Sequence, residues 1–300
     1  MRIEKGGVAF FDSGIGGLTV VNACRKWLPN ALFYYYGDNR HAPYGNLPPK
    51  KIRKYVFRVF KRFEKMQVGA AVVACNTATA VCIDELRSRF KFPIVGAEPA
   101  LLLGAKKEAS VAVLTTRATH NSAKLRRLCD KVAASYPSVN VKLCPCDGLA
   151  GEIEKHIFEK EYDYTSFLPT CSPDVVVLGC THYVYIAKQI QAFYQCPVVD
   201  GNEGMARRLT SILREKNCPN EHSRPLNDHN RPTNAQGRPF EDEFVEKHKD
   251  EKKEKMIGKT CGEKRRRKSI IPSKQKTLGK IVFLGKDKKW NKSIYEHLFL

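Results

Sequence analysis

The chain has 300 residues, of which 42% are hydrophobic, so it can build one large core or two ordinary ones. Its formal net charge of +21 is spread along the sequence, since residues 218–280 hold 17 Lys/Arg against 10 Asp/Glu, an excess of only seven. Charge distributed in this way gives little indication of a nucleic-acid partner, and no apolar run approaches the ~18–20 residues that a membrane-crossing helix needs.

Eleven cysteines could indicate a disulfide-bonded secreted protein. However, their number is odd, the chain is long, and several of them lie inside apolar runs. The opening residues MRIEKGGVAFFDSG lack the apolar stretch of a signal peptide. We therefore expect reduced thiols in a cytoplasmic protein. Cys144 and Cys146 form a lone C-x-C without a second pair at zinc spacing, so we expect no metal site.

The first hundred residues alternate between predicted strands and helices. A short apolar strand at 8–11 is followed by the Gly-rich turn DSGIGG and a helical pattern at 18–29. Further along come a strand at 31–38, a turn at 42–46, an amphipathic helix at 50–66, a strand at 69–76, a helix at 77–90 and a strand at 92–100. This alternation is typical of a parallel sheet with helices on both faces.

The same pattern restarts near residue 110. Predicted strands cover residues 110–116, 139–146, 173–183 and 196–202, and predicted helices cover residues 119–137, 148–160 and 185–195. Because both halves repeat the same order of elements, we predict an α/β fold of two pseudo-symmetric domains. Each domain is a mostly parallel sheet flanked by helices, and the active site is expected in the cleft between them.

The character of the sequence changes at about residue 215. Residues 215–277 are rich in charge, Asn and Pro and poor in apolar side chains, so we predict a disordered segment with at most a transient charged helix at 241–256. Residues 278–300 then restore a strand and a terminal helix. The charged segment therefore looks inserted between a domain and its own last elements.

Polar residues follow the predicted strands at their carboxyl ends, where open parallel sheets bind ligands. These residues are Asp12, Ser13, Asp38, Tyr44, Gly45, Cys75, Asn76, Thr77, Cys180, Thr181 and His182. The sequence contains neither G-x-G-x-x-G nor G-x-x-x-x-G-K-[ST], so a nucleotide cofactor is not indicated. Hydroxyls, amides and turn N–H groups suit a small zwitterion with carboxylate and ammonium groups.

Two of these segments match each other, because VVACNT at 72–77 and VVVLGCTH at 175–182 both end an apolar strand at a cysteine. A thiol beside the first turn of a helix can have its pKa lowered from ~8.5 to ~3.5–7.5, and it can then exchange protons near neutral pH. If the two halves face each other, Cys75 and Cys180 lie on opposite sides of the ligand. That arrangement predicts removal of a proton from one face of a carbon and delivery to the other. His182 would assist beside Cys180 and Asp12 on the other side.

Five segments in this order resemble glutamate racemases of the Asp/Glu racemase superfamily: AFFDSGIGGLTV, YGDNRHAPYGN, VVACNTATA, VGAEPA and VVVLGCTHY. The resemblance covers about residues 8–213 and resumes at the C-terminal strand. It implies a racemase without a cofactor that interconverts L- and D-glutamate and supplies D-glutamate for peptidoglycan synthesis. It also implies a cytoplasmic homodimer with no membrane partner.

The resemblance implies roles for the matching residues. Cys75 and Cys180 correspond to the two thiols that act as acid and base. The substrate-binding motifs of the family correspond to Asp12, Ser13, Tyr44, Gly45, Asn76, Thr77, Thr181 and His182. In the family a catalytic glutamate follows the strand that here ends KLCPC, and we place it at Glu152, although CDGLAGEIE departs from the commoner pattern.

The resemblance also implies that the chain returns to its first domain after about residue 205. We therefore expect a first domain made of residues 1–98, 206–214 and 278–300 and a second domain of residues 99–205. The insertion at 215–277 is longer than we expect for the family.

Two alternatives stay open. A racemase of aspartate or another small amino acid would differ in pocket size, which the sequence does not show. A binding protein could instead use the basic C-terminal segment, with EKRRRK at 263–268, to hold nucleic acid or an acidic partner. Nucleic acid is the less favoured partner, because only the enzyme hypothesis is supported by matched motifs.

Overall fold

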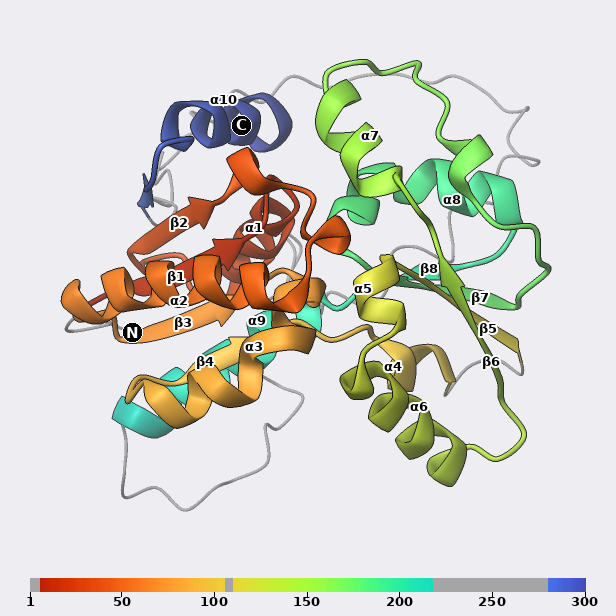
Figure 1. Cartoon of the computed structure of the whole chain (residues 1–300), viewed down its shortest axis with the longest axis horizontal. Helices are drawn as coiled ribbons and strands as arrows, with labels where there is room; N and C mark the ends of the chain where they lie inside the picture. Colours follow the sequence, from red (N-terminus) through yellow and green to blue (C-terminus); the bar gives the residue numbers. More distant parts are fainter. Residues whose placement is uncertain (1–5, 106–109, 218–279) are drawn as a thin grey trace, which may run out of the picture. The chain divides into compact units, whose positions relative to one another are not determined.

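The computed structural model describes residues 6–105, 110–217 and 280–300 (Figure 1). Its first sheet has the strand order β4-β3-β1-β2-β9, and every pair of neighbours is parallel. These strands are β1 (Val8–Asp12), β2 (Phe33–Gly37), β3 (Ala70–Val73), β4 (Ile94–Gly96) and β9 (Ile281–Phe283). The last residues of the chain therefore complete a sheet that the first residues begin.

The second sheet has the order β6-β5-β7-β8 and is also parallel throughout. Its strands are β5 (Ser110–Thr115), β6 (Asn140–Pro145), β7 (Val175–Gly179) and β8 (Val198–Val199). The predicted fold class, two parallel sheets flanked by helices, is confirmed.

Helices cover both faces of each sheet (Figure 1). Those that follow strands of the first sheet, or return to it, are α1 (Gly17–Trp27), α2 (Pro49–Lys65), α3 (Asn76–Arg89), α9 (Asn202–Asn217) and α10 (Lys288–Phe299). Those of the second half are α4 (Leu101–Ala105), α5 (Arg117–His120), α6 (Ala123–Ser135), α7 (Leu149–His156) and α8 (Ala187–Tyr194). The described residues also form the 3₁₀ turns η1 (Asn39–His41), η2 (Tyr44–Asn46), η3 (Thr165–Phe167) and η4 (Thr181–Ile186).

Strand alternation divides the core of the first half into two layers. In β1, Val8 and Phe10 pack with residues of α1 and α9, whereas Ala9 and Phe11 pack with residues of α2 and α3. Both sets are fully buried, which explains why this strand is a continuous apolar run rather than an alternating one. Burying each large apolar side chain contributes roughly 1.5–3 kcal/mol, so these two layers stabilise the sheet that carries the site.

One predicted helix is divided into two because a polar side chain caps the start of each part. The helix predicted at 119–137 is in fact α5 and α6. The Thr116 hydroxyl accepts a hydrogen bond from the N–H of Thr119, and the Ser122 hydroxyl accepts one from the N–H of Leu125. Each cap satisfies a free N–H at the start of a helix, so the segment forms two helices instead of one.

Helix α9 was not predicted from the sequence. It buries Met205, Ala206, Leu209 and Leu213 in the same apolar cluster as residues of α1. It also runs to Asn217, two residues beyond the point where the sequence suggested a disordered tail. The packing of α9 supports the expected return of the chain to its first half.

The predicted insertion, including the charged helix at 241–256, lies outside the described residues. All described residues belong to one compact unit, so the two-domain boundaries stay a prediction. Within the described ranges, no helix combines the length and the apolar character that crossing a membrane would require.

Candidate active site

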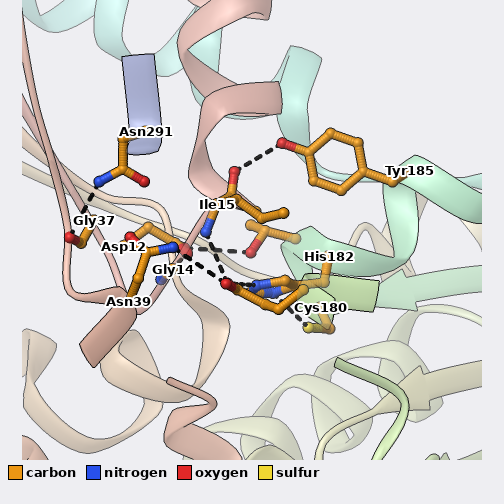
Figure 2. Close-up of polar contacts among 12 residues, drawn as sticks. Asp12, Gly14, Ile15, Gly37, Asn39, Cys180, His182, Tyr185 and Asn291 are labelled. Carbon is orange, nitrogen blue, oxygen red and sulfur yellow. Dashed lines mark hydrogen bonds and ion pairs between the residues drawn. The ribbon is translucent and has the colours of Figure 1, made fainter. Parts of the chain in front are cut away.

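Strand β1 ends at Asp12, whose side chain is completely buried. Its Oδ1 accepts a hydrogen bond of 3.1 Å from the N–H of Gly14, and its Oδ2 accepts one of 3.3 Å from the hydroxyl of Thr181 (Figure 2). Burial raises the pKa of Asp12 above its ordinary value. Asp12 therefore joins the end of the first sheet to turn η4, which follows the second.

Cys75 lies two residues after the end of β3 and caps the N-terminus of α3. Its Sγ accepts a hydrogen bond of 3.4 Å from the N–H of Ala78, and only 5% of the residue is exposed. The sequence predicts a lowered thiol pKa at this position, but this expectation is wrong for Cys75. Burial, followed by the charge of Asp12, raises the pKa of Cys75 to about 12, although hydrogen bonds from Ser13 and Ala78 act in the opposite direction.

Cys180 stands in the matching place after β7 and is 7% exposed. Its Sγ lies 3.7 Å from Nδ1 of His182, whose Nε2 lies 2.7 Å from Oε1 of Glu154 (Figure 2). Burial opposes protonation of His182, but the hydrogen bonds and charges of Cys180 and Glu154 outweigh it and raise the His182 pKa well above its ordinary value. An imidazolium with both N–H groups engaged therefore lies beside Cys180.

Glu154 on α7 connects the two halves of the molecule. Its Oε1 accepts a hydrogen bond of 2.9 Å from the N–H of Ile15, and its Oε2 accepts one of 3.1 Å from Nδ2 of Asn39. Burial alone would raise the pKa of Glu154, but the hydrogen bond and charge of His182 and the N–H of Ile15 outweigh it, so this pKa is lowered. Glu154 is thus an ionised carboxylate that holds His182.

The position expected for the catalytic glutamate, Glu152, needs correction. Glu152 accepts a hydrogen bond from the hydroxyl of Tyr162 and pairs with Lys155 and His156 on an outer part of α7. The structure does not bring it to the cluster of His182 and Cys180. Because 100° separates successive residues of a helix, residues 152 and 154 point in very different directions, and only Glu154 faces the site.

Two further groups of predicted residues lie around the same strand ends. The buried hydroxyl of Tyr44 donates to Asp38 Oδ2 at 2.7 Å, and burial followed by the charge of Asp38 raises the pKa of Tyr44. Thr77 Oγ1 lies 2.9 Å from the hydroxyl of Thr116, the residue that directly follows strand β5 of the second sheet. Gly45 lies against this same threonine, since a Cβ at Gly45 would stand 3.0 Å from Thr116 Cβ.

Buried polar groups remain available in this region. Ser13 is 3% exposed, and the side-chain oxygen of Asn76 is buried without a hydrogen-bond partner among the described residues. A buried acceptor without a donor destabilises the folded protein, and an N–H group of a ligand would provide the missing hydrogen bond. Among the described residues no group of three or more His, Cys, Asp or Glu side chains is arranged to hold a metal ion.

Sequence reasoning missed Glu154, Asn39, Thr116 and Tyr185, whose hydroxyl donates to the carbonyl of Ile15 at 2.7 Å. For Glu154 a signal exists. The apolar residues Leu149, Ala150 and Ile153 mark the buried face of α7, and Glu154 lies next to Ala150 and Ile153 on that face. The other three make contacts with segments distant in the chain and have no local signal.

Gly14 provides a direct test of the Glu154 position. A Cβ at Gly14 would lie 1.6 Å from Oε1 of Glu154, so Gly14→Ala must displace this carboxylate from His182. We expect turnover to fall about 100-fold, measured as racemisation of glutamate, the substrate that the motif resemblance implies. Gly204→Ala is the matched control, because nothing lies within 4 Å of that Cβ, and it should leave turnover unchanged. Equal turnover in the two variants would contradict this geometry.

The Glu154–His182 pair predicts a specific dependence of stability on pH. The folded pKa of His182 is raised above 6.5, so its contribution is complete below pH 6.5 and is lost as pH rises through the raised value. The folded pKa of Glu154 is lowered below 4.5, so its contribution is complete above pH 4.5 and is lost as pH falls through the lowered value. Both contributions are complete between pH 4.5 and 6.5.

We therefore expect Glu154→Gln to lower the free energy of unfolding most in that window, on the order of 3 kcal/mol, with a smaller loss on either side. Urea unfolding across the pH range measures this difference. Glu152→Gln is the control. It should lower the free energy of unfolding by well under 1 kcal/mol, because the ion pairs of Glu152 are partly exposed to solvent. A loss that is the same at every pH would contradict the assignment.

Thiols at the ends of β3 and β7, together with buried carboxylates and an imidazolium, define a two-sheet α/β protein with an acid–base site. The chain belongs to the Asp/Glu/Hydantoin racemase family, whose profile matches residues 19–209. The family resemblance inferred from the five motifs is thereby confirmed.

Several relatives of this chain within the family are named glutamate racemase. The chain is 36% identical over 237 residues to a glutamate racemase of Clostridium perfringens, which covers 75% of this chain and 90% of the relative. The Escherichia coli glutamate racemase, solved with L-glutamate and the activator UDP-MurNAc-Ala, matches with a TM-score of 0.64 and 28% identity over 70% of this chain and 83% of that one. A Francisella tularensis glutamate racemase solved with D-glutamate gives 0.59 and 29%, over 73% and 85%.

Proposed function

We propose that this chain is a cofactor-independent glutamate racemase in which Cys75 and Cys180 exchange protons with the two faces of the α-carbon. The observation that carries the proposal is the equivalent placement of the two thiols. Each follows a strand next to the centre of its own parallel sheet, and each is almost completely buried. They are also close enough for the charge of Cys180 to contribute to the raised pKa of Cys75.

In this mechanism the thiol that is ionised removes the α-proton, and the opposing thiol delivers a proton to the other face. The reverse reaction exchanges the two roles, so no proton or electron is left over. The pKa of about 12 at Cys75 means that this group is a protonated acid in the ligand-free protein. A substrate ammonium near Asp12 would reduce the unfavourable charge that this carboxylate imposes on Cys75.

Charge that develops at the α-carbon spreads into the α-carboxylate, and nearby donors stabilise it. The N–H groups at the start of α3, around Asn76 and Thr77, and the hydroxyl of Thr181 are suited to this task. The side-chain oxygen of Asn76, which has no partner within the described part of the chain, can accept a hydrogen bond from the substrate ammonium. On the other side, the His182 imidazolium donates to a thiolate at Cys180 and is held by Glu154.

The proposal extends to the substrate, the use of the product, the location of the enzyme and its oligomeric state. Glutamate is favoured over aspartate as the substrate because the relatives above are named for glutamate and two of them hold it. D-glutamate would serve peptidoglycan synthesis, and the enzyme would act as a cytoplasmic homodimer. The binding hypothesis for the basic segment concerns residues outside the described ranges.

The experiment is racemisation by the purified full chain without added cofactor, followed by chiral chromatography with L-glutamate, D-glutamate and L-aspartate. We expect glutamate to be interconverted in both directions at least about 100-fold faster than aspartate. Faster turnover of aspartate would overturn the substrate assignment, and absence of turnover with all three would overturn the enzyme assignment.

A further inference from the structure

Helix α10 and the residue before it make two contacts with the end of β2 and the turn that follows β2. Nδ2 of Asn291 donates a hydrogen bond of 3.3 Å to the carbonyl of Gly37 (Figure 2). Asp287, at the start of the helix, accepts a hydrogen bond of 3.3 Å from the N–H of Arg40. Asn39 lies between these two anchoring points, so the C-terminal helix holds the turn on both sides of it.

Asn39 is the residue that this turn presents to the second half of the molecule. Its Nδ2 donates to Oε2 of Glu154 at 3.1 Å, while Oε1 of Glu154 lies 2.7 Å from Nε2 of His182. His182 in turn lies 3.7 Å from the thiol of Cys180. The C-terminal helix is therefore connected to one of the two thiols through the backbone of the turn and then through the polar contacts of Asn39, Glu154 and His182.

Asn291 is an unusual residue for its surroundings. It is completely buried, and its Oδ1 has no hydrogen-bond partner among the described residues. A leucine, which has the same branched skeleton of side-chain heavy atoms, would avoid this orphan acceptor, so the one hydrogen bond that the amide makes is the reason we infer for it. The fit is close, because a Cβ at Gly37 would stand 2.9 Å from both amide atoms of Asn291 and 2.4 Å from the carbonyl of Gly14.

We propose that Asn291 and Asp287 are positioning residues of the active site, which hold the Gly37–Arg40 turn so that Asn39 fixes Glu154 and His182 beside Cys180. The inference rests on the proposed racemase function for its kinetic consequences. Neither residue touches the reacting atoms. Their effect is transmitted through the backbone of the turn and the side chain of Asn39, so two residues of the C-terminal segment help to set the geometry of the active site.

The test uses Asn291→Leu, Asp287→Ala and Asp287→Asn in the full chain, with Ile294→Ala as the control. Ile294 lies on the same helix and is completely buried in the apolar cluster, so its replacement loosens α10 without removing either anchor. Steady-state kinetics with both enantiomers and thermal unfolding are recorded for every variant. Imidazole ¹⁵N NMR follows the protonation of His182, which is faced by Cys180, Glu154 and Asp12.

We expect Asn291→Leu and Asp287→Ala to lower kcat roughly tenfold while KM changes less than about twofold, because misplaced groups cost transition-state stabilisation. The His182 resonance should titrate at lower pH than in the wild type, since its carboxylate partner is less well fixed. Asp287→Asn keeps an acceptor oxygen for the N–H of Arg40 and should restore kcat. Ile294→Ala should lower the melting temperature and leave kcat and the His182 titration unchanged.

Unchanged kcat and an unchanged His182 titration in Asn291→Leu would overturn the inference, as would an Ile294→Ala variant that reproduces both effects. If Asn291→Leu does not fold, the comparison of Asp287→Ala with Asp287→Asn decides the question alone. A wild-type protein that does not racemise glutamate would refute the proposed function. The His182 titrations would then still show whether the helix positions this residue.

Discussion

Replacing either Cys75 or Cys180 with alanine is expected to lower racemisation of glutamate at least about 1000-fold, equivalent to ~4 kcal/mol of transition-state stabilisation. Each variant keeps one thiol, so it can remove a proton from one face but has no acid on the opposite face. The loss should appear in kcat for both enantiomers, because both directions of the reaction use both thiols. Chiral chromatography over long incubations measures the remaining rate.

Cys82→Ala is the matched control for these variants. Cys82 is also a buried thiol on α3, seven residues after Cys75, and burial raises its pKa to about 12. It belongs to the apolar cluster with Phe60 and Ile83, so its role is packing. Its replacement should change stability slightly and leave turnover within about twofold. A Cys75→Ala or Cys180→Ala variant as active as Cys82→Ala would rule out the two-thiol scheme.

The second large effect is expected for His182→Asn, which should lower kcat about 100-fold. The raised pKa of His182 keeps it protonated through neutral pH, where it can donate to Cys180. As pH rises through this raised value, the imidazolium is lost and the wild-type rate should fall. The variant lacks this alkaline decrease, so the two pH profiles of kcat should converge at high pH.

His156→Asn separates this effect from a general loss of a histidine. His156 pairs with Glu152 and Glu159 and stacks on Tyr162, away from both thiols. Its replacement should keep the wild-type pH profile. A His182→Asn variant with kcat within about threefold of the wild type would show that the imidazolium contributes little.

The parallel sheets could be predicted because strands β1, β3, β5 and β7 are buried apolar runs that end at recognisable polar turns. Asp12 ends β1, Cys75 lies two residues after β3 and Cys180 directly follows β7, so local sequence was sufficient to find them. Helix α9 was missed although Met205, Leu209 and Leu213 recur at helical spacing, because its packing partner α1 lies far away in the chain.

The remaining differences arise from tertiary structure. The apolar face of α7 favours Glu154 over Glu152, but the contacts of Glu154 with Ile15 and Asn39 arise only when the two halves of the chain come together. The helix N-terminus at Cys75 favours a lowered pKa, but burial and the charge of Asp12 outweigh it. The contact between Asn291 and Gly37 joins residues 254 positions apart, so no sequence pattern could indicate it.

The central claim is that Cys75 and Cys180 serve opposite faces of one carbon. The most direct measurement is exchange of the α-hydrogen in D₂O, followed by ¹H NMR, with Cys75→Ala and Cys180→Ala each given L-glutamate and D-glutamate separately. We predict that each variant exchanges the α-hydrogen of one enantiomer without inverting it, and that the two variants select opposite enantiomers. Exchange of the same enantiomer by both variants, or of both enantiomers by either one, would contradict the account.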